Sequence, residues 1–420
     1  NLNSDLFCSW HIMKTDKLQV DLSSKYRWII LTLLFFTILV AFMGRLSTSV
    51  ALDEIGDGLV WSRAEQGFLG GVLMGIFMVP YGFSNIFFSP KIDEHGSKII
   101  LFGSMIGCSL AVFLAAFFGH NYILFLLSRM LLGLSQGVMY PLATKVIAGW
   151  FGVKERGRAN SIFMVGAPIG IAISPIIMGP VIKALGWQYS FYMVAIIGFI
   201  LTVPIFIFIT DSPDSKNDHG RTVRKDIDLL KAFKELLHDH DFRQITVGFT
   251  AVNTVFWGTT LWVPSYLEQT TGLNLGDNAY MAAIPYIGAL LGMLIGSWVS
   301  DLKGNEDGII IFSLFTSGLM IIILTFSPIS GSGMAIFLLF LVFLTGQLAP
   351  PLFFTKLQNN IHGEELGSAT GLMNGIANSF GVMGPVSVGV MIALTGSYGL
   401  GLIVLSVIAF AGLTGFRHFL

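Results

Sequence analysis

Long apolar runs separated by short polar stretches dominate the hydrophobicity pattern of the chain. A helix needs about 20 consecutive apolar residues to cross the hydrocarbon core of a bilayer. Twelve stretches approach or exceed that length, at 28–54, 66–88, 98–118, 122–147, 159–183, 188–210, 243–268, 278–300, 308–328, 333–357, 365–394 and 397–417. The pattern therefore predicts an all-α membrane protein with twelve transmembrane helices.

One long polar segment, 211–241, interrupts this series after the sixth stretch. It contains Pro213, a run of charges and an amphipathic stretch that begins at Leu229. The predicted domains are a cytoplasmic N-terminal tail at 1–27, a six-helix bundle at 28–210, a cytoplasmic linker at 211–242 and a second six-helix bundle at 243–420.

The positions of the cations predict the orientation of the chain. Cytoplasmic loops near span ends are enriched in Lys and Arg. If the N-terminus is in the cytoplasm, all but four of the 24 Lys and Arg lie on the cytoplasmic side. The exceptions are Arg63 and Lys183, which lie outside, and Arg45 and Arg129, which lie within spans. We expect a multi-pass protein of the cell (plasma or inner) membrane with both termini in the cytoplasm.

Composition narrows the functions that remain. The chain is 54% apolar and 12% charged with a net charge of −1, so it lacks the basic excess that nucleic-acid binding requires. Two cysteines, Cys8 and Cys108, form no zinc-binding spacing. No Walker sequence, nucleophile elbow or pair of in-span carboxylates occurs. We therefore expect no metal, no cofactor and no enzymatic activity, and the 48 glycines indicate helices in close contact.

The two halves of the chain repeat each other. Ser89, Asp93 and Gly96 recur after 208 residues, as Ser297, Asp301 and Gly304. Gln136 recurs 211 residues later as Gln347, and a proline follows each. A duplicated six-span unit is typical of transporters in which one half rocks against the other around a substrate held near the midplane.

Several motifs resemble the major facilitator superfamily over essentially the whole chain. Asp93, Gly96 and Lys98 resemble its loop between the second and third spans. Arg129, Gly133 and Gln136 resemble its fourth-span signature, and the fifth span is similarly rich in Gly and Pro. The resemblance implies two pseudo-symmetric six-helix bundles.

Further motifs resemble the organic-anion branches of that superfamily. These branches are the anion:cation symporters and the organophosphate:phosphate antiporters. The motifs that resemble them are Trp150-Phe151, Glu155 to Ala159 and Trp262-x-Pro264. Proton-coupled symporters are expected to carry Asp and Glu at the positions where this chain has Gly44 and Gln136. The antiporters are expected to carry a second Arg at the position where this chain has Phe256. The resemblance therefore leaves both branches open.

Arg45 is the most informative single residue. It lies within the first span, where a cation costs roughly 2.5–3.5 kcal/mol near the bilayer centre. An anionic substrate bound in a water-filled cavity would offset this free-energy cost. The alternative is an Arg held permanently by Asp53, by Glu54 or by carbonyl groups.

Further candidate substrate contacts lie in both halves. The resemblance places Tyr81 and Gln136 at positions that line the central cavity. The repeat maps Arg45 onto the neighbourhood of Asn253. Asn253 could bind hydroxyl groups of the substrate together with Trp257, Asn374 and Asn378. Asn374 and Asn378 are one helical turn apart and so share a helix face. The alternative for each is hydrogen bonding or packing between helices.

A second group of residues is expected to serve gating or structure. For Arg129 we favour packing or gating over substrate contact, because its guanidinium can brace carbonyl groups. The other members of the group are Asp93, Gly96, Glu155, Arg156 and Asp301.

None of the 25 acidic residues lies in the middle of a span. Proton coupling normally requires a titratable group whose access changes during the cycle. The pattern favours exchange or uniport, with Asp53 or the substrate carboxylate as alternative proton carriers.

The sequence thus predicts a secondary active or facilitative transporter for a small organic anion, such as a carboxylate, sugar acid or phosphate ester. Its expected partners are that anion, the lipid bilayer and a coupling ion, either a proton or a counter-anion, and we expect a monomer. An exporter of amphiphilic compounds is the alternative within transport, and a non-transporting membrane receptor is the alternative outside it.

Overall fold

The computed structural model describes residues 2–88, 96–210, 229–328, 331–361 and 365–419, and the regular structure in these residues is entirely helical. Asp93 lies outside the described residues.

The first half of the chain supplies nine described helices. They are α1 (Leu2–Val50), α2 (Leu52–Gly58), α3 (Arg63–Gly75), α4 (Met78–Phe87), α6 (Ser97–Phe117), α7 (Tyr122–Gln136), α8 (Met139–Trp150), α9 (Val153–Leu185) and α10 (Trp187–Phe208).

The second half supplies the remaining described helices. They are α11 (Leu229–His238), α12 (His240–Thr271), α13 (Leu275–Lys303), α14 (Glu306–Phe326), α15 (Ser332–Gly346), α16 (Pro350–Asn360), α17 (Glu365–Gly381), α18 (Met383–Thr395), α19 (Gly399–Gly412) and the 3₁₀ helix η2 (Leu413–Phe419).

Eleven stretches of the described residues are helical, long and apolar enough to cross a membrane. They correspond to all the expected spans except 243–268, which lies within α12. This 32-residue helix is less apolar because it carries polar residues such as Asn253 and Thr254, yet most of its side chains from Phe242 to Leu267 are buried. α12 packs against other helices along its length, so protein rather than lipid surrounds much of it.

Several expected spans consist of two helices. The second span is α3 followed by α4, and the fourth is α7 followed by α8. The tenth breaks before Pro350-Pro351, where the missing backbone N–H groups cannot continue the helical ladder. The first span ends at Val50, earlier than the expected limit of 54, and α2 follows it as a separate helix.

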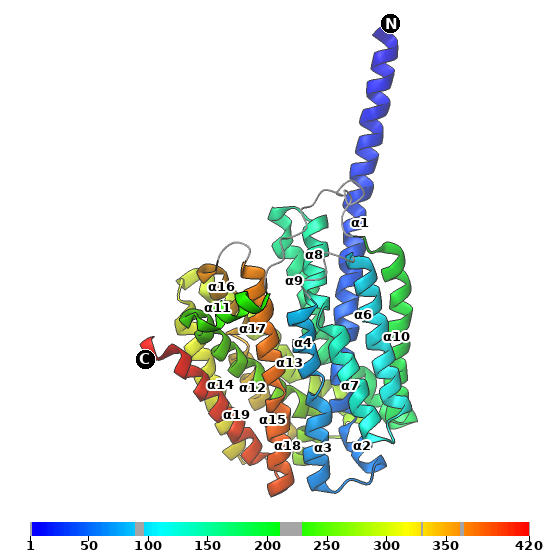
Figure 1. Cartoon of the computed structure of the whole chain (residues 1–420). Coiled ribbons are helices and arrows are strands. Elements are labelled where there is room, and N and C mark those ends of the chain that lie inside the picture. Colours follow the sequence, from blue (N-terminus) through cyan, green and yellow to red (C-terminus); the bar gives the residue numbers. More distant parts are fainter. Residues whose placement is uncertain (1, 89–95, 211–228, 329–330, 362–364, 420) are drawn as a thin grey trace.

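The two halves lie side by side, as Figure 1 shows for helices coloured blue to green and green to red. Contacts between them join α3 with α18, α4 with α17, and α9 with α13. At one such contact, a Cβ on Gly389 would lie 2.2 Å from the carbonyl oxygen of Gly67. Only glycine permits this backbone approach.

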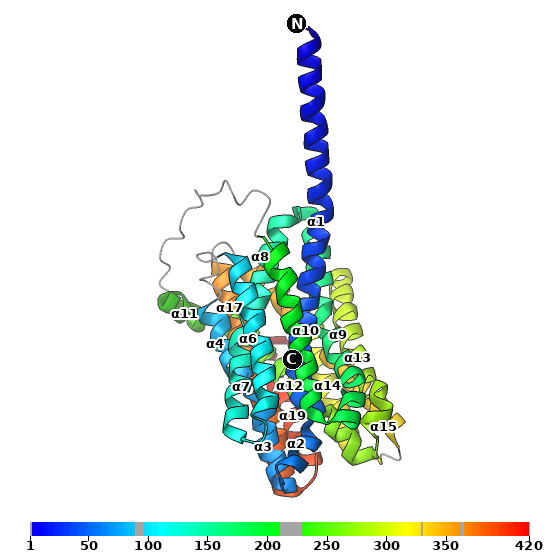
Figure 2. The same ribbon diagram turned by 90° about the vertical axis from the view of Figure 1, so that its right-hand side faces the viewer.

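The bundle has two ends. The linker end carries Arg27, Trp150 and α11, and α1 extends beyond the other helices there (Figure 2). The distal end is the opposite one, with α2 and the turn between α9 and α10. At the distal end a capping box starts α3, because Ser62 accepts from the Glu65 backbone N–H and the Glu65 carboxylate accepts from that of Ser62.

Candidate functional site

Arg45 lies in the interior of the first half, on α1, with only 3% of its surface exposed. Its Nε donates a hydrogen bond to Oε1 of Gln136 on α7. The amide nitrogen of Gln136 in turn donates to the carbonyl oxygen of Ala41, at 2.9 Å. The structure thus brings together two of the predicted site residues and fixes the orientation of the Gln136 amide.

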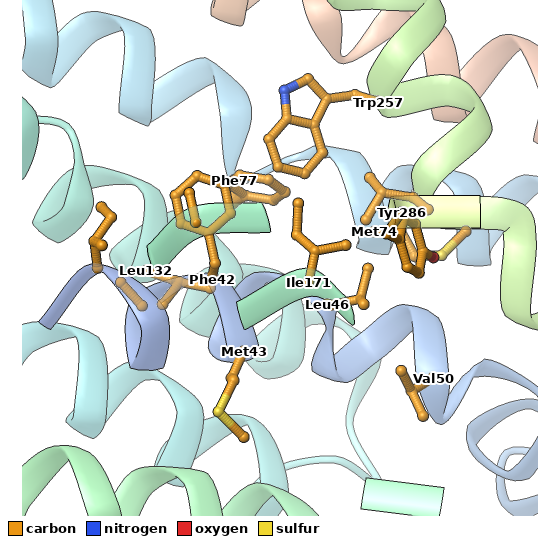
Figure 3. Packing of buried hydrophobic residues seen from close by; sticks show 14 of the residues in the cluster. Phe42, Met43, Leu46, Val50, Met74, Phe77, Leu132, Ile171, Trp257 and Tyr286 are labelled. Carbon is orange, nitrogen blue, oxygen red and sulfur yellow. The ribbon is translucent and has the colours of Figure 1, made fainter. Parts of the chain in front are cut away.

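Four aromatic rings surround the guanidinium of Arg45. The distances from its Cζ to the ring centroids are 4.2 Å for Phe42, 4.5 Å for Tyr81, 5.4 Å for Phe77 and 5.5 Å for Trp257. Figure 3 shows Phe42 of α1 and Trp257 of α12 together with Phe77, which lies in the turn between α3 and α4. We call these four aromatic residues, together with Arg45 and Gln136, the Arg45 cluster. The faces of aromatic rings attract a cation but do not neutralise its charge.

Arg129 braces α1 beside this cluster. Its two terminal nitrogens donate to the carbonyl oxygens of Gly44 and Arg45, each at 2.8 Å, and the residue is 1% exposed. A Cβ on Gly44 would lie 3.0 Å from a methyl carbon of Val112 on α6. The small residue and the guanidinium together allow α1 to lie close to α6 and α7.

No carboxylate forms an ion pair with Arg45 among the residues that the structure describes. Asp53, considered above as a permanent partner, instead accepts hydrogen bonds from Gln66 and Gln269. In the same residues the hydrogen bond from Nε is the only one that the Arg45 side chain makes. Its terminal nitrogens are therefore available to a negatively charged ligand.

The second half contributes a separate polar group on α12 and α17. Asn253 donates to the carbonyl oxygen of Ala377 at 2.8 Å, and Asn378 donates to Oδ1 of Asn374 at 2.9 Å. Within the described part of the chain these three residues make no hydrogen bond with the Arg45 cluster. Trp257 on α12 is the cluster's contribution from the second half among the described residues.

The residues expected to serve gating or structure lie mostly at the linker end. Glu155 forms an ion pair with Arg27 at 2.6 Å, and Arg156 donates to the carbonyl oxygens of Ala148 and Phe151. Gly96 precedes α6 with φ of 77°, a conformation that favours glycine. Asp301 lies within α13 and Asp93 in 89–95; neither the Asp301 side chain nor any part of Asp93 is among the described parts of the chain.

Sequence reasoning missed three neighbours of the site. Phe42 lies three residues before Arg45, and Phe77 four before Tyr81, so helical spacing placed both near residues already identified. Cys108 on α6 is buried, and its thiol interacts with the side chain of Gln136. Only the packing of α6 against α7 reveals this contact.

Comparison with known proteins identifies a family. The profile described as Major Facilitator Superfamily matches residues 34–385. The chain is 27% identical over 402 residues to the "Probable L-galactonate transporter" of Escherichia coli (strain K12), covering 90% of this chain and 86% of that protein. It is 26% identical over 398 residues to the "Hexuronate transporter" of Bacillus subtilis (strain 168), covering 89% and 90%. A "Probable sulfoacetate transporter" of Cupriavidus necator is 28% identical, covering 90% of each chain.

A solved structure shares the fold. It is that of a bacterial homologue of the human lysosomal transporter Spinster in an inward-facing, occupied conformation. The TM-score is 0.73 at 15% identity, and the match covers 93% of this chain and 96% of the other.

Proposed function

Since the chain belongs to the Major Facilitator Superfamily, we propose that it carries a small organic anion across a membrane by alternating access, with Arg45 binding the anionic group. Proteins of this family are transporters and not enzymes. The predicted all-α fold and the resemblance to the organic-anion branches are confirmed by the family match and by the relatives.

The observation that carries the proposal is the environment of Arg45. The side chain is buried among four rings, and no described carboxylate neutralises it. An unpaired buried charge is costly, whereas an incoming carboxylate would form charge-assisted hydrogen bonds with both terminal nitrogens. The site would therefore favour anions over uncharged molecules of the same size.

A sugar acid is the substrate class that we favour. The relatives are described as transporters of L-galactonate, hexuronate and sulfoacetate, all small organic anions. Asn253, Asn374 and Asn378 would bind the hydroxyl groups if the two halves close around the substrate.

The membrane setting completes the proposal. The excess of Lys and Arg at the linker end supports a cytoplasmic position for that end and for both termini. The protein would act as a monomer in the cell membrane. The absence of a mid-span carboxylate from the sequence supports exchange with a counter-anion or uniport over proton symport.

Binding to the purified protein tests this function directly. A ligand that binds only the folded state raises the melting temperature, because stability grows with RT ln(1 + [L]/Kd). We expect stabilisation by galacturonate or galactonate and none by galactose or galactitol. Stabilisation by amphiphilic anions alone would favour the exporter instead, and stabilisation by the uncharged sugars would contradict the anion site.

Variants of Arg45 provide the second test. Lys lacks the planar fork of the guanidinium, so Arg45→Lys should bind weakly and Arg45→Ala weaker still. A charge-assisted contact contributes about 1.5–3 kcal/mol, which predicts a rise in Kd of about tenfold to more than a hundredfold for Arg45→Ala. Isothermal titration calorimetry with galacturonate measures it, and Arg158→Ala, on the exposed linker end, is the matched control. Unchanged affinity in Arg45→Ala would remove the basis of the site.

A further inference from the structure

The second half of the chain contains a small pocket inside its helix bundle. The pocket lies between α12, α14, α15 and α19, and most of the side chains that line it are apolar. Three polar side chains also line it, namely Thr259 on α12, Ser317 on α14 and Gln347 just after α15. Their exposed fractions are 4%, 3% and 6%, so all three are buried.

The side chain of Gln347 makes no hydrogen bond with any other described residue, although it is buried and lines the pocket. Ser317 and Thr259 donate their hydroxyl hydrogens to carbonyl oxygens of their own helices, those of Leu314 at 3.2 Å and Val255 at 2.8 Å. Both hydroxyl oxygens can still accept a hydrogen bond. A buried amide without a partner destabilises the folded state, so a polar ligand in the pocket would be stabilising.

The internal repeat relates this pocket to the Arg45 cluster. Gln347 is the counterpart of Gln136 at an offset of 211 residues. The same offset relates Phe256, which lines the pocket, to Arg45. In the first half Gln136 accepts a hydrogen bond from the Arg45 guanidinium, whereas a phenyl ring offers Gln347 no such donor. The second half therefore has the glutamine without the side chain that satisfies it in the first half.

Size and charge indicate which ligand fits. The centre of a water molecule can occupy about 20 Å³ of the pocket. One buried water needs about 10–15 Å³ of such space and two to four polar partners. The described residues that line the pocket include none with a charged side chain, so an ion would lack a counter-charge there.

We propose that the pocket binds one water molecule. The water accepts a hydrogen bond from the amide nitrogen of Gln347 and donates to the hydroxyl oxygens of Ser317 and Thr259. Phe256 packs against Trp257 of the Arg45 cluster with ring centroids 5.4 Å apart, so the pocket adjoins that cluster through two rings. The proposal is independent of the transported substrate.

Radiolytic labelling in water enriched in a heavy oxygen isotope tests the site directly. Hydroxyl radicals formed from a bound water oxidise the side chain beside it. Phe343 lines the pocket and is only 2% exposed, so bulk water does not reach it. We expect mass spectrometry of the protein in lipid nanodiscs to find the isotope at Phe343. Phe125 on α7 is 0% exposed and lies outside the pocket lining, so it should remain unlabelled.

Two variants remove the water by different routes. Gln347→Met replaces the amide with an apolar side chain of similar size. Gly346→Ala adds a methyl group whose carbon would lie 3.5 Å from Cβ of Ser317, an ordinary contact, so it fills space without a clash. Each should lower the labelling of Phe343 about tenfold, as expected for the loss of a buried hydrogen bond. Gly103→Ala, on the exposed face of α6, is the matched control and should leave the labelling unchanged.

The melting temperature provides a second readout. Gly346→Ala displaces the water but leaves the Gln347 amide in place without a ligand, so the melting temperature should fall by about 2–4 °C. Adding Gln347→Met to that variant removes the amide, so most of the fall should be recovered. The effects of the two substitutions would then be non-additive.

Each measurement has an outcome that would overturn the proposal. The first is an unlabelled Phe343 in the unsubstituted protein. The second is labelling that persists unchanged in Gln347→Met and in Gly346→Ala, since its source would then be bulk water. The third is a melting temperature that falls further in the double variant. None of these measurements involves a substrate, so they leave the tests of the proposed function unaffected.

Discussion

Gln136 determines the charge balance around Arg45. It offers Arg45 an uncharged acceptor, so the guanidinium keeps its full charge for a ligand. The same amide donates to the carbonyl oxygen of Ala41, so two hydrogen bonds hold one side chain. A substitution here can therefore change the charge of the site with little change in its shape.

Gln136→Glu tests this balance. Its carboxylate would pair with Arg45 and compete with the substrate, so we expect Kd for galacturonate to rise by about tenfold to a hundredfold at about pH 8. As pH falls through the pKa of the new carboxyl group, the competing charge disappears and affinity should recover. Calorimetry at about pH 8 and about pH 5 measures both effects.

Gln136→Met is the control at the same position. It removes the hydrogen bond but adds no charge, so its loss of affinity should be smaller and should not recover in acid. Equal behaviour of the two variants would contradict the role assigned to charge.

At the scale of elements, glycines set the distances between helices. A Cβ on Gly133 of α7 would lie 1.8 Å from the carbonyl oxygen of Phe77, just ahead of α4. Helices in lipid gain little from hydrophobic association, so close packing of small residues stabilises their contacts. The approach at Gly133 also places Phe77 against Arg45.

Gly133→Ala should therefore destabilise the first half. The added methyl group meets backbone and cannot be relieved by a side-chain rotation, and overpacking of this kind costs about 1–3 kcal/mol or more. The melting temperature of the purified protein should fall. Gly103→Ala, on the exposed face of α6 with no atom within 4 Å of its new Cβ, should leave the melting temperature unchanged or slightly higher. A similar effect of both substitutions would show that the Gly133 contact does not limit stability.

At the scale of the whole molecule, transport requires the two halves to separate at one end while they close at the other. The ion pair between Lys183 on α9 and Asp277 on α13 crosses between the halves at the distal end. A covalent link at this point would prevent the distal end from opening.

Cross-linking Lys183→Cys to Asp277→Cys with a short bifunctional thiol reagent should therefore arrest transport. Binding of substrate from the linker end should remain, because the link joins the two halves only at the distal end. Uptake and binding by proteoliposomes measure the two effects, in a protein whose native thiols are removed by Cys8→Ser and Cys108→Ala.

A second pair of cysteines controls for the reagent. Lys356 on α16 and Asp307 on α14 also form an ion pair, but within the second half. Cross-linking Lys356→Cys to Asp307→Cys should leave transport active. If the Lys183 and Asp277 link also left transport active, the halves would not need to separate at that point.

The sequence by itself predicted the all-helical membrane fold, the duplication and the family resemblance, but not the number of helices. These features can be recognised in the linear sequence without knowing how the helices pack. They are the length of the hydrophobic spans, the recurrence of Gln136 at Gln347 and the charge of Arg45 within an apolar run. The family match confirmed the fold that they predicted. The breaks within spans were less predictable from the sequence, because a glycine does not always end a helix. Gly166 lies inside a continuous helix, whereas Gly137 lies at a break.

Only the tertiary structure decided which residues meet. Phe42, Tyr81 and Trp257 lie on three helices and surround Arg45 because α1, α4 and α12 converge. Asp53, which the sequence placed within reach of Arg45, instead accepts a hydrogen bond from Gln269, over 200 residues away. Such partners depend on how helices from the two halves pack, and local hydrophobicity carries no information about that choice.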